Sequence, residues 1–350
     1  MVAGTVRIGI IGAGSITRKM HIPKLQAIEG VQITEVANRS PASAQKVADE
    51  FQIPTVRNHW HDIIESKDVD AVVIGTWPNL HREASCMALQ AGKHVMCEAR
   101  MAMDEAEART MLQASYQHPE CVVQIVPSPF TLHVDPTLLR MLDNNEIGKP
   151  RLFRFEYQAP PLVPMGGTLH WRRNKINSGS NIMVLGIIYE SLLRWFGSAE
   201  WVNAHAEVIN NRAVDPETGQ DVEVGVPDYL SVQMKMTHGI MGSLLLNELG
   251  TQPSSSSIQI FGDRGMMHLD FEMEGKLSIA KNPGEALQEV SIPAGQAGQW
   301  RVEEEFINTI RGLEDIEYTT FTTGVEYMKF IQAVNDSFNN NGERITIPTG

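Results

Sequence analysis

A mostly apolar run followed at once by a glycine-rich turn constrains the fold of this chain more than any other feature. Residues 6–11 form the run, and the segment Gly12-Ala13-Gly14-Ser15-Ile16-Thr17 follows it. Such a run is typical of a strand buried in a parallel sheet. Glycines permit a tight turn and allow a phosphate group to approach the backbone closely. The helix that follows offers free N–H groups. The segment predicts a Rossmann unit whose dinucleotide cofactor contacts Gly12, Gly14, Ser15 and Ile16; the alternative is a turn that binds another phosphate ligand.

Strand-like and helical segments alternate through the first third of the chain. Further strands are expected at 31–37, 71–75, 93–97 and 121–126, with helices at 15–29, 42–51, 81–91 and 104–117. Strict alternation predicts a parallel sheet with right-handed crossovers. We therefore expect an α/β Rossmann domain over residues 1–126.

The pattern changes after the segment Val126-Pro127-Ser128-Pro129, which is typical of a domain boundary. Strand-like runs then dominate, at 151–157, 204–209, 230–237, 242–248, 256–261, 265–270 and 276–279, with helices at about 181–196, 299–312 and 323–339. Residues 127–350 are thus expected to form an α+β domain with a large open, mainly antiparallel sheet. Helices should cover one face, and the other face suits pairing with a second copy.

Residues at the end of the second expected strand bear on the choice of cofactor. An NAD-binding protein commonly has an acidic residue there, which accepts hydrogen bonds from the ribose. This chain has Asn38-Arg39-Ser40 instead. Arg39 can pair with a 2′-phosphate, and Ser40 adds a donor, so NADP is favoured over NAD. The alternative is a surface arginine beside an NAD ribose that Asn38 binds.

Charge and apolar runs exclude several classes of partner. The chain of 350 residues has a formal net charge of −13, which argues against nucleic acid because phosphate binding needs clustered Lys and Arg. No run of about 18 apolar residues occurs, so a membrane-spanning helix is not expected.

Candidate metal ligands are few in the sequence. Cys86, Cys97 and Cys121 lack the spacing of a metal site, and an odd number of thiols favours a reducing, cytoplasmic location. The segment His59-Trp60-His61-Asp62 is better explained as the start of a helix than as a zinc site. No metal is expected.

Several local patterns occur in an order that resembles the glucose–fructose oxidoreductase and inositol dehydrogenase family, Gfo/Idh/MocA. They are residues 8–14, His21-Ile22-Pro23, residues 70–76 with His81, residues 91–95 leading into Cys97-Glu98, residues 145–148, and Trp171-Arg172. The resemblance runs essentially from end to end. It implies an NAD(P)-dependent oxidoreductase of sugars or cyclitols that assembles as a homodimer or homotetramer through the C-terminal sheet.

The resemblance also implies roles for individual residues. Thr76, Trp77 and His81 should lie near the cofactor, and Glu98 near the nicotinamide ribose. Trp77 stands where many relatives have proline. The alternative for His81 is a helix residue with no ligand contact.

The chain departs from the family at both of the usual catalytic positions. The family has Glu-Lys-Pro where this chain has Glu98-Ala99-Arg100, so the lysine is missing. Arg100 is a cation for substrate binding or catalysis, but its pKa is too high for a general base near neutral pH. On the helix that usually carries Asp, His and Asp, the matching positions hold Val184, Ile188 and Ser191.

Other residues are therefore considered for proton transfer and substrate binding. Tyr189 and Glu190 follow the missing histidine, and the alternative is that both are ordinary helix residues. His170 is the best histidine candidate, with a surface loop residue as the alternative. Trp171 and Arg172, next to it, are candidates for binding the substrate.

These observations favour an NAD(P)-dependent oxidoreductase that acts on a sugar, cyclitol or keto-sugar by hydride transfer. One alternative is a lyase, isomerase or glycosidase that retains its cofactor and gives no net redox change. Another is a non-catalytic NAD(P)-binding sensor, which the missing catalytic residues support.

Overall fold

The computed structural model describes residues 4–271 and 275–348 and divides the chain into two compact units. The first unit extends to Pro127 and also contains Arg301–Met328, while the second contains Ser128–Trp300 and the residues from Lys329 onward. The change of pattern after residue 126 predicts that all later residues lie in the second domain. Residues 301–328 belong to the first unit instead, because helix α9 (Val302–Ile310) packs against helix α1 (Ile22–Gln26).

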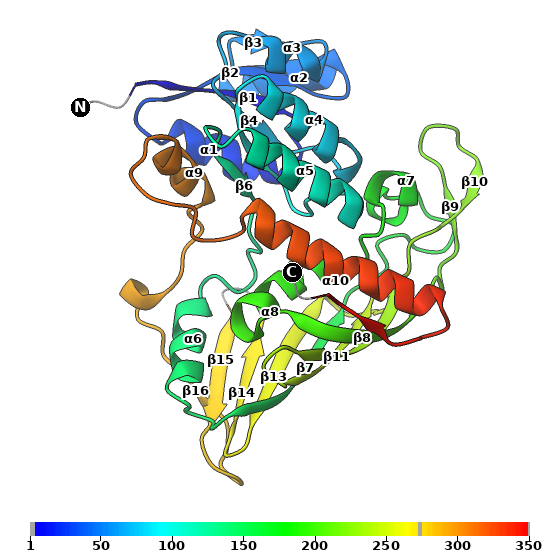
Figure 1. Ribbon diagram of the computed structural model, residues 1–350. Helices are drawn as coiled ribbons and strands as arrows, with labels where there is room; N and C mark the ends of the chain where they lie inside the picture. The colour runs from blue at the N-terminus through cyan, green and yellow to red at the C-terminus, as the bar shows by residue number, and fades with distance from the viewer. Residues whose placement is uncertain (1–3, 272–274, 349–350) are drawn as a thin grey trace. The chain divides into compact units, whose positions relative to one another are not determined.

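The first unit is built on a six-stranded sheet in the order β3-β2-β1-β4-β5-β6, and every neighbouring pair is parallel. Its strands are β1 (Val6–Ile11), β2 (Val31–Ala37), β3 (Thr55–Val56), β4 (Ala71–Ile74), β5 (His94–Cys97) and β6 (Val123–Ile125). Its helices are η1 (Thr17–His21), α1 (Ile22–Gln26), α2 (Pro41–Phe51), α3 (Trp60–Glu65), α4 (Pro78–Gln90), α5 (Glu105–Gln117) and α9 (Val302–Ile310). Figure 1 shows these helices around the sheet. The expected α/β Rossmann architecture is confirmed.

Short-range signals in the sequence fix where these helices begin. The Ser40 hydroxyl accepts a hydrogen bond from the Ser43 N–H at the start of α2, and the Asp104 carboxylate accepts one from the Glu107 N–H at the start of α5. The His59 N–H donates to Asp62 as α3 begins. The segment that contains these two residues therefore starts a helix, and among the residues that the structure describes no cluster of potential metal ligands is found.

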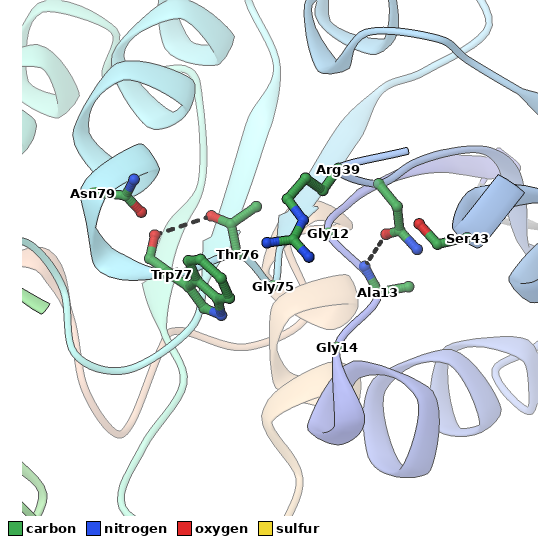
Figure 2. A pocket seen from close by; sticks show the side chains of 10 residues that line it. Gly12, Ala13, Gly14, Arg39, Ser43, Gly75, Thr76, Trp77 and Asn79 are labelled. Carbon is green, nitrogen blue, oxygen red and sulfur yellow. Dashed lines mark hydrogen bonds between the residues drawn. The ribbon is translucent and has the colours of Figure 1, made fainter. Parts of the chain in front are cut away.

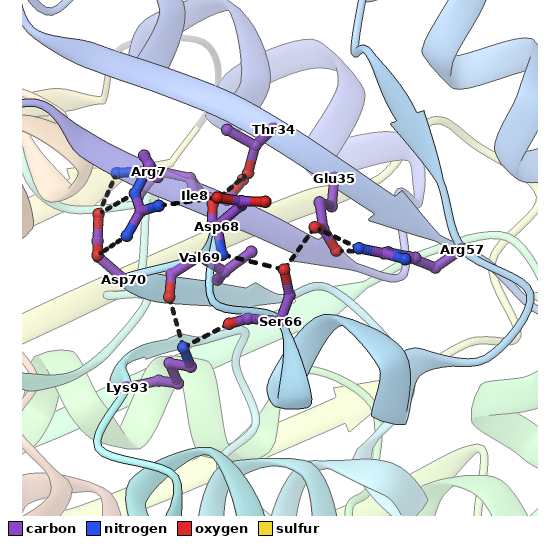
Figure 3. Close-up of polar contacts among 10 residues, drawn as sticks. All are labelled: Arg7, Ile8, Thr34, Glu35, Arg57, Ser66, Asp68, Val69, Asp70 and Lys93. Atoms are coloured by element: carbon purple, nitrogen blue, oxygen red, sulfur yellow. Dashed lines mark hydrogen bonds and ion pairs between the residues drawn. The ribbon is translucent and has the colours of Figure 1, made fainter.

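A polar network ties together neighbouring strands of the sheet (Figure 3). Arg7 on β1 forms a forked pair with Asp70 just before β4, at 3.0 and 2.7 Å. Buried Glu35 on β2 accepts two hydrogen bonds from Arg57, each 2.8 Å long, and one of 2.6 Å from the Ser66 hydroxyl. These pairs span neighbouring strands, so they hold the sheet in register.

The second unit contains a nine-stranded sheet in the order β16-β15-β14-β13-β7-β12-β11-β8-β17. Its strands are β7 (Pro150–Gln158), β8 (Ala199–Glu207), β11 (Tyr229–Met236), β12 (Met241–Asn247), β13 (Ser255–Gly262), β14 (Met266–Asp270), β15 (Lys276–Ala280), β16 (Gln288–Glu289) and β17 (Ile345–Thr346). Only β7 and β12 pair in parallel, so among the described residues the sheet is mainly antiparallel, as expected.

Helices and a small hairpin complete the second unit. They are α6 (Asp135–Asp143), η2 (Trp171–Arg173), α7 (Lys175–Ser178), α8 (Leu185–Phe196), η3 (Ala294–Gln296) and the two-stranded sheet of β9 (Arg212–Val214) and β10 (Asp221–Glu223). Helix α10 (Phe321–Asn339) contains the boundary between Met328 and Lys329. Helix α6 and strands β9, β10 and β16 are not among the elements expected from the sequence. The three strands have only two or three residues each, too few for a periodic pattern.

Alternating burial along the strands gives the nine-stranded sheet one covered and one open face. Helix α8 covers the first face, where the Phe196 ring stacks on Phe153 of β7 with centroids 5.1 Å apart (Figure 1). The opposite face exposes Leu152, Met241 and Leu245 to about two-fifths of their surface, at 41%, 38% and 39%. In the described part of the chain, no helix is long and apolar enough to span a membrane.

The Glu35 network gives a pH-dependent prediction. Burial acts to raise the pKa of Glu35, but the hydrogen bonds from Arg57 and Ser66 outweigh it and hold that pKa below its usual value. Glu35→Gln should lower the free energy of unfolding by about 1 kcal/mol at pH 7, because Arg57 is partly exposed. The contribution is present above the unfolded carboxyl's pKa and is lost as the pH falls through the lowered value, so the difference should shrink below about pH 4.

Urea unfolding of Glu35→Gln and wild type at a series of pH values measures this difference. Asp68→Asn is the matched control, because the Asp68 side chain is 78% exposed in its pair with Arg7. A difference for Glu35→Gln that is the same at about pH 3 and pH 7 would contradict the prediction.

Candidate cofactor-binding site

A cavity of about 260 Å³ lies where the carboxyl ends of β1, β2 and β4 meet (Figure 2). Its lining comes from the glycine turn, the end of β2 with the start of α2, and the segment after β4. The residues are Gly12, Ala13, Gly14, Asn38, Arg39, Ser43, Gly75, Thr76, Trp77 and Asn79. In open parallel sheets this edge is where nucleotide ligands bind.

The glycine turn has the geometry that a bound pyrophosphate requires. Gly12 has a φ of +84°, and a Cβ there would lie 2.5 Å from the Thr76 Cγ2. Helical residues run without a break from Ser15 through η1 and α1, and the Arg18 N–H donates to the Gly14 carbonyl at 3.0 Å. The free N–H groups of the first helical turn therefore face the turn, as anion binding requires.

Thr17 occupies a position where this motif usually has a smaller residue, and the structure shows how it fits. Thr17 is buried, and its hydroxyl donates to the Gly12 carbonyl at 3.4 Å. A Cβ at Gly75 would lie 2.1 Å from the Thr17 Oγ1 and 2.3 Å from the Gly12 carbonyl oxygen. The missing side chain at Gly75 thus makes the room that Thr17 takes.

The three residues of the Asn38-Arg39-Ser40 segment have different surroundings: Asn38 contacts the glycine turn, Arg39 lines the cavity, and Ser40 caps α2. The Asn38 Oδ1 accepts a hydrogen bond of 2.6 Å from the Ala13 N–H, which fixes the glycine turn. Arg39 is exposed, and its guanidinium carbon lies 5.6 Å from the centroid of the Trp77 ring (Figure 2). Ser40 caps α2, so its hydroxyl already accepts a hydrogen bond from the Ser43 N–H.

His81 lies behind the cavity rather than in it. Its ring is fully buried, with Nδ1 3.0 Å from the Arg100 carbonyl oxygen and Nε2 3.1 Å from the Thr76 carbonyl oxygen. Burial lowers the pKa of His81, so a neutral ring donates its one N–H to one of the two carbonyls. His81 thereby links the segment after β4 with the segment after β5.

The segment after β5 carries Glu98 and Arg100. The Glu98 side chain is 15% exposed, and one of its oxygens is 2.9 Å from the His21 Nε2. Arg100 is 2% exposed, and the Ala99–Arg100 peptide bond is cis. Sequence reasoning did not assign a role to His21 or to its second partner, Glu303; the signal for the first was the His21-Ile22-Pro23 pattern.

The catalytic candidates on α8 are buried in the second unit. Tyr189 is 1% exposed, its hydroxyl accepts a hydrogen bond of 2.8 Å from the Ala199 N–H, and its ring stacks on Phe330. Glu190 is 3% exposed, accepts a hydrogen bond from the Ser128 N–H and forms an ion pair with Arg194. These contacts account for both side chains as part of the packing around α8.

The segment around η2 places the remaining candidates nearer to the surface. His170 is half-buried, and its Nδ1 accepts a hydrogen bond of 3.3 Å from the Arg172 N–H. Burial and the nearby charge of Arg172 lower the pKa of His170. Arg172 is exposed, with its guanidinium carbon 5.0 Å from the centroid of the Trp171 ring.

A parallel six-stranded sheet, a glycine turn before a helix and a cavity at the switch between β1 and β4 define a dinucleotide-binding protein of the Rossmann class. Comparison with known proteins gives the family. The model of the GFO/IDH/MocA oxidoreductase family, NAD-binding Rossmann fold, matches residues 6–126, and the model of the GFO/IDH/MocA C-terminal domain matches residues 137–268. The chain belongs to this oxidoreductase family, as the resemblance implied.

Individual relatives are distant. An uncharacterized oxidoreductase of Synechocystis is 22% identical over 296 residues, covering 82% of this chain and 78% of its own length. An inositol 2-dehydrogenase/D-chiro-inositol 3-dehydrogenase of Shouchella clausii is 31% identical over 155 residues, covering only 43% of this chain and 44% of the relative. A solved levoglucosan dehydrogenase in complex with NADH and L-sorbose has a TM-score of 0.85 at 20% identity, covering 98% of this chain and 99% of that one.

The close approach at Gly75 gives a prediction for cofactor binding. Gly75→Ala should weaken the binding of NADPH and NADH at least tenfold, because the new Cβ would displace Thr17 and the Gly12 carbonyl. Fluorescence titration of the reduced cofactor measures this, with thermal unfolding as a check on the fold. Gly295→Ala is the control, since nothing lies within 4 Å of a Cβ there. Unchanged affinity in Gly75→Ala would contradict the assignment of this turn to the cofactor.

Proposed function

We propose that this chain is an NAD(P)-dependent oxidoreductase that acts on a sugar, cyclitol or keto-sugar by hydride transfer. The observation that carries the proposal is the cavity at the glycine turn, within a chain of the GFO/IDH/MocA oxidoreductase family. The substrate class is supported by the relatives named as an inositol dehydrogenase and a levoglucosan dehydrogenase.

The residues at the cavity fit a dinucleotide. Gly12 and Gly75 allow the ends of β1 and β4 to meet at the cavity, because a Cβ at either position would collide with Thr76, or with Thr17 and the Gly12 carbonyl. The helix that starts at Ser15 presents its N–H groups to the turn. Asn38 holds the turn through the Ala13 N–H. When bound, the nicotinamide ring supplies or accepts the hydride, so the chain itself must position the substrate carbon and move one proton.

The cofactor preference that we propose is NADP. Arg39 is an exposed cation at the end of β2, where an acidic residue would repel a 2′-phosphate. The Arg39 guanidinium carbon lies 5.6 Å from the centroid of the Trp77 ring. This contact holds the guanidinium at the cavity, where it can pair with that phosphate. NAD is the alternative, with Asn38 beside the ribose.

His170 is the residue that we favour for proton transfer. Its lowered pKa keeps the ring neutral near pH 7, which a general base requires. Trp171 and Arg172 lie next to it and provide an aromatic face and a cation for a polyhydroxylated substrate. Arg100, Tyr189 and Glu190 stay candidates, although the contacts of the last two favour a structural role.

Assembly and location complete the proposal. The open face of the nine-stranded sheet, with Leu152, Met241 and Leu245 exposed, suits pairing with a second copy as a homodimer or homotetramer. The three cysteines are free in the structure, which is consistent with the cytoplasm.

The proposed activity is tested by incubating the protein with NADP⁺ or NAD⁺ and a panel of sugars and cyclitols, and with NADPH or NADH and keto-sugars. Turnover should appear as a change of absorbance at 340 nm. His170→Asn should lower kcat about 100-fold or more, because general acid–base catalysis contributes on this scale. Product formed without any absorbance change would instead indicate a lyase, isomerase or glycosidase that retains its cofactor. Cofactor binding without turnover across the panel would favour a sensor and contradict the proposal.

The cofactor preference is tested separately by Arg39→Ala. NADPH affinity should fall about tenfold or more, because the charge-assisted pair with the 2′-phosphate is lost, while NADH affinity should change by less than about threefold. Arg39→Lys is the matched control, since it keeps the charge but loses the fork and should retain part of the preference. An equal loss for both cofactors would show that Arg39 does not select NADP.

A further inference from the structure

A fully buried histidine joins two carboxylates inside the first unit, and the proposed function has no use for it. His21, the last residue of η1, has its Nδ1 2.6 Å from the Glu303 Oε1 and its Nε2 2.9 Å from the Glu98 Oε1. The exposed fractions of the His21 and Glu303 side chains are 0% and 2%, whereas that of Glu98 is 15%. The three side chains therefore form a connected series that runs from the buried Glu303, through His21, to the partly exposed Glu98.

The geometry fixes the protonation state of the ring. An ionised carboxylate only accepts hydrogen bonds, so a ring with a carboxylate at each nitrogen donates from both, and it does so as the imidazolium. Burial acts to lower the pKa of His21, but the hydrogen bonds and charges of Glu303 and Glu98 raise it to about 9. At pH 7 the His21 ring is thus an imidazolium held between the two side chains.

The sheet order identifies the part of a dinucleotide that Glu98 would meet. Arg39 follows β2, on one side of β1, whereas Glu98 follows β5, on the other side beyond β4. A dinucleotide that places its adenosine half at Arg39 and its pyrophosphate at the glycine turn extends its nicotinamide half toward the ends of β4 and β5. Glu98 is the carboxylate on that side.

We propose that Glu303 and His21 are positioning residues that hold the Glu98 carboxylate in place to accept hydrogen bonds from the hydroxyls of the nicotinamide ribose. The proposal rests on the proposed cofactor site. An unrestrained glutamate has several rotamers, and ordering it costs free energy on binding. Here the His21 Nε2–H donates to Oε1 and the Ala99 N–H donates to Oε2 at 3.2 Å, so the carboxylate is ordered beforehand.

Glu303 is needed because a buried imidazolium is unstable with too little compensating charge. It lies in the first turn of α9, which returns to the first unit from far along the chain. With a neutral residue at 303, the pKa of His21 would fall and the ring would become neutral. A neutral ring can still donate from Nε2 to Glu98, but this hydrogen bond lacks the charge assistance of the imidazolium, so the restraint on Glu98 would weaken.

Comparing the affinity for whole cofactors with the affinity for their adenosine halves tests whether Glu303 positions Glu98 or only stabilises the fold. In Glu303→Gln, affinity for NADPH and NADH should fall about tenfold, while affinity for 2′,5′-ADP and ADP should change by less than about twofold. The matched control is Glu305→Gln on the same helix. Glu305 is also buried, but its carboxylate accepts hydrogen bonds from Gln124 and the Glu317 N–H. Its substitution should leave the ratio of whole-cofactor to fragment affinity unchanged.

A double-mutant cycle tests whether Glu303 acts through Glu98. Glu98→Gln should weaken whole-cofactor binding by itself, and adding Glu303→Gln should cause no further loss. Additive losses, or an equal loss of fragment and whole-cofactor affinity in Glu303→Gln, would overturn the proposal. Equal affinity of wild type for fragments and whole cofactors would also overturn it, because the nicotinamide half would then contribute nothing. If wild type binds neither, the cofactor site itself fails instead.

The pH dependence in the wild type supplies a test that needs no variant. Because the pKa of His21 is raised to about 9, the imidazolium persists through neutral pH and is lost above that value. The ratio of whole-cofactor to fragment affinity should stay level up to about pH 8 and fall as the pH passes about 9. In Glu303→Gln the fall should begin at lower pH. A wild-type ratio that is level through pH 10 would count against the proposal.

Discussion

The cofactor site depends on two glycines that allow two backbone segments to meet without side chains between them. At Gly12 a side chain would collide with Thr76, and at Gly75 it would collide with Thr17 and with the Gly12 carbonyl. This close approach joins the end of β1 to the end of β4 and leaves the first helical turn facing the cavity. Asn38 then holds the turn from the end of β2. The cation at Arg39, the aromatic ring at Trp77 and the carboxylate at Glu98 all take their places from strands that this contact aligns.

Two buried histidines in the same unit are held in opposite protonation states by their partners. His81 faces two carbonyl oxygens, which carry no net charge, and burial lowers its pKa. His21 faces two carboxylates, and its pKa is raised to about 9. The comparison shows that burial alone does not decide the charge of a side chain, because the charge of the groups it contacts can outweigh desolvation. In our account His81 links two loops, and His21 orders the Glu98 carboxylate that contacts the cofactor.

The sequence predicts those features whose signals are local. The alternation of apolar strands with helices fixes the Rossmann sheet, and the glycine turn and Arg39 locate the cavity. The pair of His21 with Glu303 joins residues 282 positions apart, so no local pattern indicates that α9 belongs to the first unit. The surroundings of Tyr189 and Glu190 depend on how α8 packs, which the sequence of the helix alone does not specify. The family's usual lysine and histidine are missing, so resemblance supplies the fold and the cofactor class but not the proton-transfer residue.

A crystal structure of the protein with bound NADP⁺ tests the central claim most directly. Our account predicts the 2′-phosphate at Arg39, the pyrophosphate at the N–H groups that follow Gly12, and the hydroxyls of the nicotinamide ribose within hydrogen-bond distance of Glu98. It also predicts that the contacts of His21 with Glu98 and Glu303 persist in the complex. A cofactor bound with its nicotinamide half away from Glu98, or with the 2′-phosphate away from Arg39, would contradict the account.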